Sequence, residues 1–259
     1  MNVSGIIQAR TGSTRLPKKI FYKINNKTLL ELYIDRVKHS KLLNNIIVAT
    51  TTNPNDDIVI DLIKEKYGDE IKLFRGSEND VLDRYYRCAQ KFKVDIICRL
   101  TPDDPFVEPD IIDMAINKIT SDDYDFVTNH FPEVTFIEGL DMEVYTFKAL
   151  EKCWKKSKLK SEREHVFLYI KNNAEKFKIY NFKQEKNESH IRLTIDYNKD
   201  YILTSKIYQY WNNDKIIPRY KDIIEILDKH PELLNINKGI PKYEGINKSI
   251  ARDEYDNSL

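Results

Sequence analysis

The chain of 259 residues lacks the features that mark several large classes of protein. Its three cysteines, Cys88, Cys98 and Cys153, show no CxxC spacing, so we expect neither a disulfide framework nor a zinc site, and a reducing cytoplasm fits. No apolar run approaches the length of a membrane span, and the polar start MNVSGIIQAR does not resemble a signal peptide. The chain has 42 lysines and arginines and 41 aspartates and glutamates, which gives a net charge of +1. This balance does not indicate binding to nucleic acids or membranes through overall charge.

Two common phosphate-binding patterns, GxxxxGK[ST] and GxGxxG, are also missing. In their place, the apolar run Val3 to Ile7 predicts a buried first strand, and a basic loop of small residues follows it to Lys19. Such a loop exposes backbone N–H groups as a nest for anions, and its arginines and lysines can neutralise a polyphosphate. We therefore predict a nucleotide-phosphate site here; the alternative is a solvated basic turn.

Apolar strands alternate with amphipathic helices through the first half of the chain. Strands are expected near 3–7, 46–51, 71–74 and 95–100, and helices near 29–37, 56–67, 81–92 and 111–119. This alternation predicts an α/β protein with a mostly parallel sheet covered by helices on both faces. Ligands bind such sheets at the carboxyl ends of the strands, where the basic loop lies.

The second half has a less regular pattern. Further strands are expected near 125–129, 140–146, 178–182 and 190–195, with a helix-rich section ending near 174 and a helix over 199–211. One or two short amphipathic helices should follow Pro218, and then a polar tail. No clear linker divides the chain, so we expect one domain with an inserted lobe.

Two acidic sites follow predicted strands. Asp103 and Asp104 stand between two prolines at the end of the strand near 95–100, and Asp196 ends the strand near 190–195. Hard oxygen ligands beside a polyphosphate loop suit Mg²⁺, which uses one or two carboxylates and keeps several waters. The alternative for each is a helix cap.

Three other stretches carry candidate side chains whose first interpretation is structural. The stretch 75–84 forms a turn and a helix cap, with Asp80 or Asp83 in the first helical turn. Asp141 and Glu143 share one face of a strand, which can be a solvated face. Ser161 and Glu164 have the spacing of a capping box, and the adjacent His165 is either a proton carrier or a structural histidine.

The basic loop QARTGSTRLPKKI resembles the signature ARxGSxRLPxK of the CMP-sugar synthetases, the 3-deoxy-manno-octulosonate cytidylyltransferase-like group. The similarity is greatest to the branch that includes the spore-coat polysaccharide protein SpsF. RGSENDVLDRYY, RLTPDDP, GLDME, SEREHV and LTIDYNKD resemble later signatures of the same branch in the same order, although Pro102 replaces the usual glycine. The resemblance covers roughly residues 3 to 211 and implies a Rossmann-like nucleotide-diphospho-sugar transferase fold.

The resemblance also implies roles for individual residues. Catalytic roles fall on Arg10, Arg15, Lys19 and Asp103, and Mg²⁺ would be held by Asp103 and Asp196. The residues implied to contact CTP are Ala9, Arg10, Gly12, Ser13, Arg15, Lys19, Arg75, Ser77, Asp80 and Arg84. Those implied to contact the acceptor are Asp141, Glu143, Arg163, His165 and Arg192.

The implied reaction is transfer of CMP from CTP to a sugar acid or a related small molecule, with release of pyrophosphate. By the same resemblance, residues 1–211 form the cytidylyltransferase domain, 131–187 an inserted lobe that serves a homodimer and the acceptor, and 212–259 a helical extension. The alternatives are a glycosyltransferase of the related fold, a cytidylyltransferase for a phosphonate or phosphorylated polyol, and a silent nucleotide-binding protein. The close D-x-D of many such glycosyltransferases is missing at Asp103, although Asp141 and Glu143 form a D-x-E.

Overall fold

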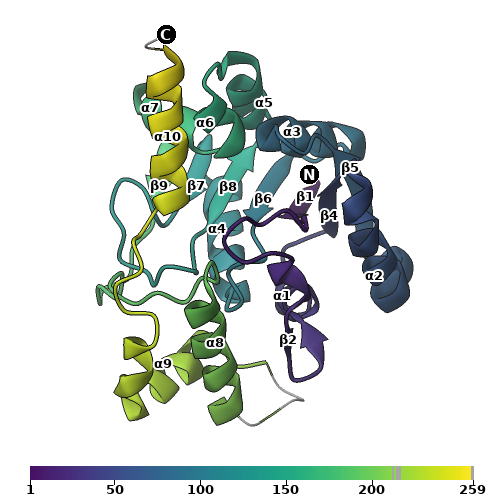
Figure 1. The fold of residues 1–259 in the computed structure, drawn as a ribbon. Helices are drawn as coiled ribbons and strands as arrows, with labels where there is room; N and C mark the ends of the chain where they lie inside the picture. The colour runs from purple at the N-terminus through teal and green to yellow at the C-terminus, as the bar shows by residue number, and fades with distance from the viewer. Residues whose placement is uncertain (212, 214–216, 258–259) are drawn as a thin grey trace.

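A seven-stranded sheet forms the middle layer of the molecule in the computed structural model, which describes residues 1–211, 213 and 217–257 (Figure 1). Its strand order is β5-β4-β1-β6-β8-β7-β9. The bounds are β5 (Lys72–Gly76), β4 (Asn45–Thr51), β1 (Val3–Gln8), β6 (Ile96–Leu100), β8 (Glu143–Thr146), β7 (Phe126–Thr128) and β9 (Ile179–Asn181). Only β8 runs antiparallel to its neighbours among the described strands of this sheet, which confirms the predicted mostly parallel α/β fold.

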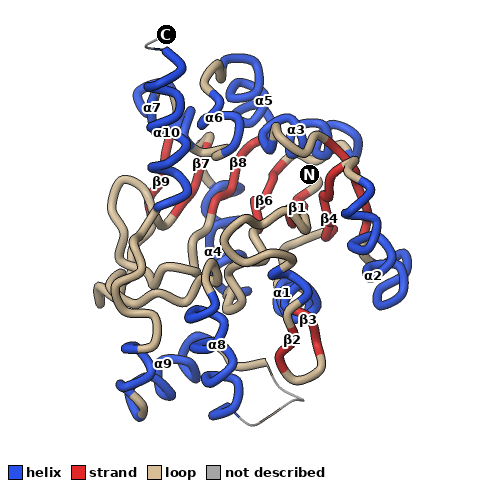
Figure 2. The backbone as a smooth tube through the Cα atoms, in the orientation of Figure 1, coloured by secondary structure: helices blue, strands red, loops and turns tan. Residues whose placement is uncertain are grey.

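Helices cover both faces of this sheet (Figure 2). One core contains apolar residues of α1 (Leu29–Val37), α2 (Asp57–Tyr67), α4 (Pro109–Ser121), α8 (Asn198–Trp211) and α9 (Tyr220–Lys229). The other contains those of α3 (Val81–Phe92), α5 (Phe147–Lys156) and α7 (Leu168–Asn172). Alternate strand residues serve the two cores, since Ile6 lies in the second and Ile7 in the first, as the two-residue period of a strand requires.

Helix α10 (Glu244–Asn257) and several short elements complete the described chain. The short elements are the hairpin β2 (Lys23–Ile24) and β3 (Lys27–Thr28), helix α6 (Lys160–Glu164) and the 3₁₀ turns Lys19–Phe21, Pro54–Asp56, Gly68–Glu70, Ala174–Lys176 and Pro231–Asn235. Thr28 and Glu31 form a capping box at the start of α1, and Asp80 caps α3 by accepting from Asp83 N at 2.8 Å. None of the described helices is long and apolar enough to cross a membrane.

The second half departs from expectation in three places. Residues 131–187 supply β8 and β9 to the main sheet and α5 to α7 to one face, so they do not stand apart as a lobe. Residues 190–195 form no ladder, and an isolated bridge joins Arg192 to Glu138. The polar tail contains helix α10, which returns from the α9 end of the molecule to lie beside α6 (Figure 1). The expected domain boundary falls at Asn212, which lies outside the described residues.

Candidate active site

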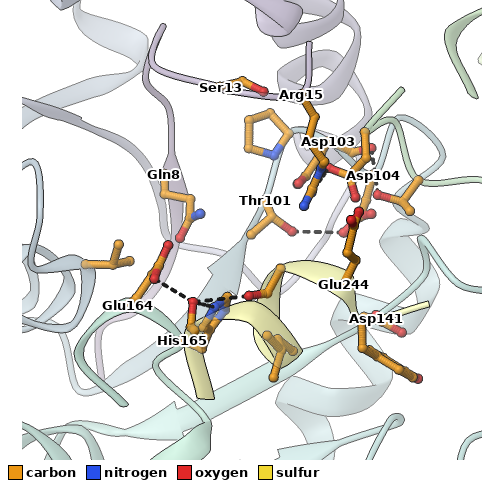
Figure 3. Close-up of a pocket in the computed structure, with 18 of the residues that line it drawn as sticks. Gln8, Ser13, Arg15, Thr101, Asp103, Asp104, Asp141, Glu164, His165 and Glu244 are labelled. Atoms are coloured by element: carbon orange, nitrogen blue, oxygen red, sulfur yellow. Dashed lines mark hydrogen bonds and ion pairs between the residues drawn. The ribbon is translucent and has the colours of Figure 1, made fainter. Parts of the chain in front are cut away.

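A cavity of about 640 Å³ opens at the carboxyl ends of β1 and β6. The basic loop after β1, the Asp103 turn after β6, the segment around Asp196 and the start of α10 all contribute to its lining. In Figure 3, Arg15, Asp103 and Asp104 lie on one side of this space, and Glu164 and His165 lie on the other. The cavity is therefore built where the alternation of strands and helices predicted a ligand site.

The basic loop is held in shape by Asp56, which is 2% exposed. Its Oδ1 accepts from the backbone N and the hydroxyl of Thr11 at 2.7 and 2.8 Å, and its Oδ2 accepts from Thr51 Oγ1. Asp56 is also the residue before the first turn of α2, but its carboxylate makes no capping bond to that helix. The short loop side chains leave backbone N–H groups near the cavity, which suits an anion.

Two carboxylates and two cations meet at the centre of the cavity. Lys19 Nζ lies 3.2 Å from Asp103 Oδ2 and 2.9 Å from Asp196 Oδ1, and Arg15 lies 2.5 Å from Asp196. Burial disfavours the charge on Asp196, but Lys19 and Arg15 outweigh it and hold the pKa of Asp196 well below its usual range. Burial likewise opposes the charge on Lys19, and the two carboxylates raise the pKa of Lys19 on balance.

The backbone brings these two carboxylates together. The segment before Asp196 lies against the turn after β6, because Ile195 N donates to Asp103 O at 2.7 Å. The Lys19 ammonium already occupies a cationic position between the carboxylates, so the donor set fits a hard cation. The described residues contain no group of three or more metal-ligating side chains, so phosphate or water oxygens would complete the shell of a bound ion.

The sheet edge beyond this centre carries a second set of polar side chains. Arg99 Nη1 donates to Glu143 Oε1 at 2.8 Å, and its Nη2 lies 3.4 Å from Gln8 Oε1. His130 Nε2 lies 3.4 Å from the same Glu143 oxygen. Burial raises the pKa of Asp141, which also lines the cavity. These groups extend from Gln8 at the end of β1, where the basic loop begins, to His130 in the loop after β7.

Helix α10 encloses the cavity with residues that no sequence motif indicated. Ser249 Oγ lies 3.1 Å from His165 Nε2 and donates to Glu164 Oε2 at 2.7 Å. Asp253 accepts from the backbone N of Ser161, which replaces the expected capping box of Ser161 and Glu164. Burial lowers the pKa of His165, so this ring is mostly neutral at pH 7.

Most of the predicted site residues line this one cavity. They are Arg10, Gly12, Ser13, Arg15, Lys19, Arg84, Asp103, Asp141, Glu143, His165, Arg192 and Asp196. Ala9, Arg75, Ser77, Asp80 and Arg163 are not among the lining residues. Arg163 binds Asp80 at 2.5 Å, Arg75 binds Asp57 at 2.7 Å, and Ser77 accepts from Asp80 N at 3.0 Å. Each of these polar side chains already has a structural partner, which explains why it does not turn to the cavity.

Gly139 controls the approach of the segment that carries Asp141. Its φ is +108°, and a Cβ there would lie 2.7 Å from Thr194 N. We expect Gly139→Ala to lower the free energy of unfolding by at least about 2 kcal/mol, from strain in φ and from the clash together. Urea unfolding measures this loss. Gly239→Ala is the control, since its φ is +86° but nothing lies within 4 Å. An equal loss in both variants would show that the close packing at Gly139 does not matter.

Comparison with known proteins agrees with this geometry. The spore coat polysaccharide biosynthesis protein SpsF of Bacillus subtilis is 31% identical over 88% of this chain and 94% of its own. A 3-deoxy-manno-octulosonate cytidylyltransferase of Pelobacter propionicus is 29% identical over 47% of this chain and 46% of its own. The solved structure of a cytidylyltransferase from Leptospira borgpetersenii has a TM-score of 0.85 and 36% identity, over 93% of this chain and 99% of that one. A family model described as cytidylyltransferase matches residues 4–229, and the chain belongs to that family of nucleotidyltransferase enzymes.

Proposed function

We propose that this protein transfers CMP from CTP to an oxygen of a sugar acid in a magnesium-dependent reaction that releases pyrophosphate. The observation that carries the proposal is the pair of carboxylates, Asp103 and Asp196, held around Lys19 beside the basic loop. The sugar-acid acceptor, and a place in the biosynthesis of surface polysaccharides or glycoconjugates, are supported by the names of the relatives.

In this proposal the chain works mainly by position and charge. Arg10, Arg15, Lys19 and Arg84 all line the cavity. The first three would bind the triphosphate, and Arg84 would contact the cytidine. Asp103 and Asp196 hold Mg²⁺, which when bound neutralises phosphate charge and polarises phosphate oxygens. Arg15 is paired with Asp196, and Lys19 is paired with both carboxylates, so these ion pairs orient the two cations toward the site.

The test is pyrophosphate release by the purified protein with Mg²⁺, each of the four ribonucleoside triphosphates, and a panel of sugar acids, phosphosugars, phosphonates and phosphorylated polyols. We expect release with CTP, an acceptor requirement, and loss of activity when a chelator removes the metal. Release of a nucleoside diphosphate from a nucleotide sugar would favour the glycosyltransferase instead. CTP binding without pyrophosphate release across the panel would contradict the proposal and favour a silent nucleotide-binding protein.

The same family resemblance supports two further parts of the proposal. We propose a homodimer formed through residues 131–187, to be checked by light scattering of the purified protein. We also propose a cytoplasmic location, to be checked by cell fractionation.

Cys88, Cys98 and Cys153 are free and buried, and burial raises the pKa of each thiol, so these thiols are unreactive in the folded chain.

A further inference from the structure

A row of side chains crosses the carboxyl edge of the sheet on the floor of the cavity. Gln8 at the end of β1 contacts Arg99 of β6, Arg99 contacts Glu143 at the start of β8, and Glu143 faces His130 just after β7. The strand register produces this order, since Glu143 pairs with Arg99 on one side and with Thr128 on the other. The row therefore joins the nucleotide half of the cavity to the acceptor half.

Glu143 is held in one orientation and one charge state. Its Oε1 accepts from Arg99 Nη1 at 2.8 Å and faces His130, and its Oε2 accepts from the Tyr145 hydroxyl. Burial alone would raise the pKa of Glu143, but Arg99 and His130 outweigh burial and lower it to about 2. A buried carboxylate that stays ionised across the physiological range can orient a neighbouring imidazole and stabilise its protonated form.

His130 lines the cavity with a side chain that is 7% exposed. The edge of the ring packs against Phe167, with 4.9 Å between ring centroids. Nε2 is the nitrogen that faces Glu143 Oε1, at 3.4 Å. Nε2 is buried and makes no hydrogen bond, so Glu143 Oε1 is a near neighbour and not a hydrogen-bonded partner. The backbone N of His130 donates to Thr128 Oγ1, and no hydrogen bond involves the other ring nitrogen, Nδ1, in the described part of the chain. A proton on Nε2, facing the carboxylate, leaves the lone pair of Nδ1 available to accept a proton.

We propose that His130 is the general base that takes the proton from the acceptor hydroxyl, with Glu143 as the positioning residue behind it. This inference rests on the proposed function. The proton passes from the acceptor oxygen to His130 Nδ1 as that oxygen forms a bond to the α-phosphorus. The bond from the α-phosphorus to the bridging oxygen breaks, and pyrophosphate leaves with the electron pair. An imidazole held by a carboxylate is a common arrangement for such a base.

The charges around His130 suit this role. Burial lowers the pKa of His130, but Glu143 and Asp141 raise it and Arg99 lowers it, and the balance is a pKa above 6.5. The neutral ring is the base, so activity should fall as pH drops through the pKa of His130. Asp141 is the competing candidate, because it lines the same half of the cavity and burial raises its pKa.

The first test compares His130→Gln with wild type in pyrophosphate release from CTP, using 3-deoxy-manno-octulosonate as the acceptor probe. We expect kcat to fall by about 10²–10⁴-fold, and the acid limb of the pH profile to disappear, with CTP affinity unchanged. His39→Gln, at an exposed histidine, should leave the rate and profile unchanged. Loss of the acid limb in Asp141→Asn but not in His130→Gln would overturn the inference.

The second test needs no turnover, so a wrong base assignment can be told from a wrong proposed function. Nitrogen NMR of the wild-type ring should show the neutral form protonated at Nε2 and a His130 pKa above 6.5 that falls in Glu143→Gln. A neutral ring protonated at Nδ1, or a pKa that is insensitive to Glu143, would overturn the inference even if the protein is a cytidylyltransferase. The expected spectrum with no pyrophosphate release would overturn the proposed function, and the base assignment with it.

Discussion

Asp103→Ala should lower kcat for pyrophosphate release by about 10³-fold while the protein remains folded. The loss follows because Asp103 is proposed to hold Mg²⁺ against the phosphates, and removing one such electrostatic contact typically costs several kcal/mol in the transition state. The fold should survive, because the Asp103 side chain is 33% exposed and Lys19 keeps its bonds to Asp196 and to Ile195 O at 2.6 Å.

Asp103 is a cleaner target for this test than Asp196. The Asp196 carboxylate also pairs with Arg15 and Arg192, so its removal would leave two further partly buried cations with fewer partners. Asp69→Ala removes an exposed aspartate and provides a matched control whose turnover should stay at the wild-type value. Near-normal turnover in Asp103→Ala, with thermal unfolding unchanged, would show that Asp103 does not hold a metal that the reaction needs.

The first half of the fold was predictable because its signals are local. Strands such as Val3–Gln8 and Asn45–Thr51 are apolar runs buried on both faces, and α1 shows both a capping box and an apolar face. The strands β8 and β9 were expected near 140–146 and 178–182, but a strand pattern does not indicate which strands pair, so their place in the main sheet was not predicted.

The centre of the site was predictable for a related reason. Lys19, Asp103 and Asp196 were each expected near the end of a strand or in the loop after it, and such positions converge at one edge of a parallel sheet. The strand expected before Asp196 is an irregular segment in the structure. The hydrogen bond from Ile195 N to Asp103 O nevertheless brings Asp196 close to Asp103.

The rest of the site depends on contacts between residues distant in sequence. His130 lies in a loop with no motif, and its role is suggested only when β7 and β8 pair and bring it to Glu143. Ser249 stands in a polar segment, and nothing local indicates that α10 crosses back to His165. The ion pair between Arg163 and Asp80 could not be predicted from the sequence either. The two residues are 83 positions apart, and no sequence pattern indicates that they are in contact.

Asp56→Ala should destabilise the fold strongly, although Asp56 does not line the cavity. Its carboxylate is the acceptor for three donors, the backbone N and hydroxyl of Thr11 and the hydroxyl of Thr51, and all of these groups are buried. Leaving three buried donors without an acceptor costs about 1 kcal/mol each, so we expect the free energy of unfolding to fall by about 3 kcal/mol. Urea unfolding measures the change.

The same substitution should weaken CTP binding although Asp56 does not line the cavity, because Thr11 sets the conformation of the basic loop whose backbone faces the phosphates. Calorimetry with CTP measures this second effect. The neighbouring Asp57→Ala is the control, since that side chain is 55% exposed and makes one ion pair with Arg75, so its effect on stability should stay within about 0.5 kcal/mol. A destabilised Asp56→Ala protein that binds CTP as tightly as wild type, at a temperature where both are folded, would show that the loop keeps its shape without this anchor. In that case the phosphates would be held by the cationic side chains alone, and the backbone nest would have no part in binding.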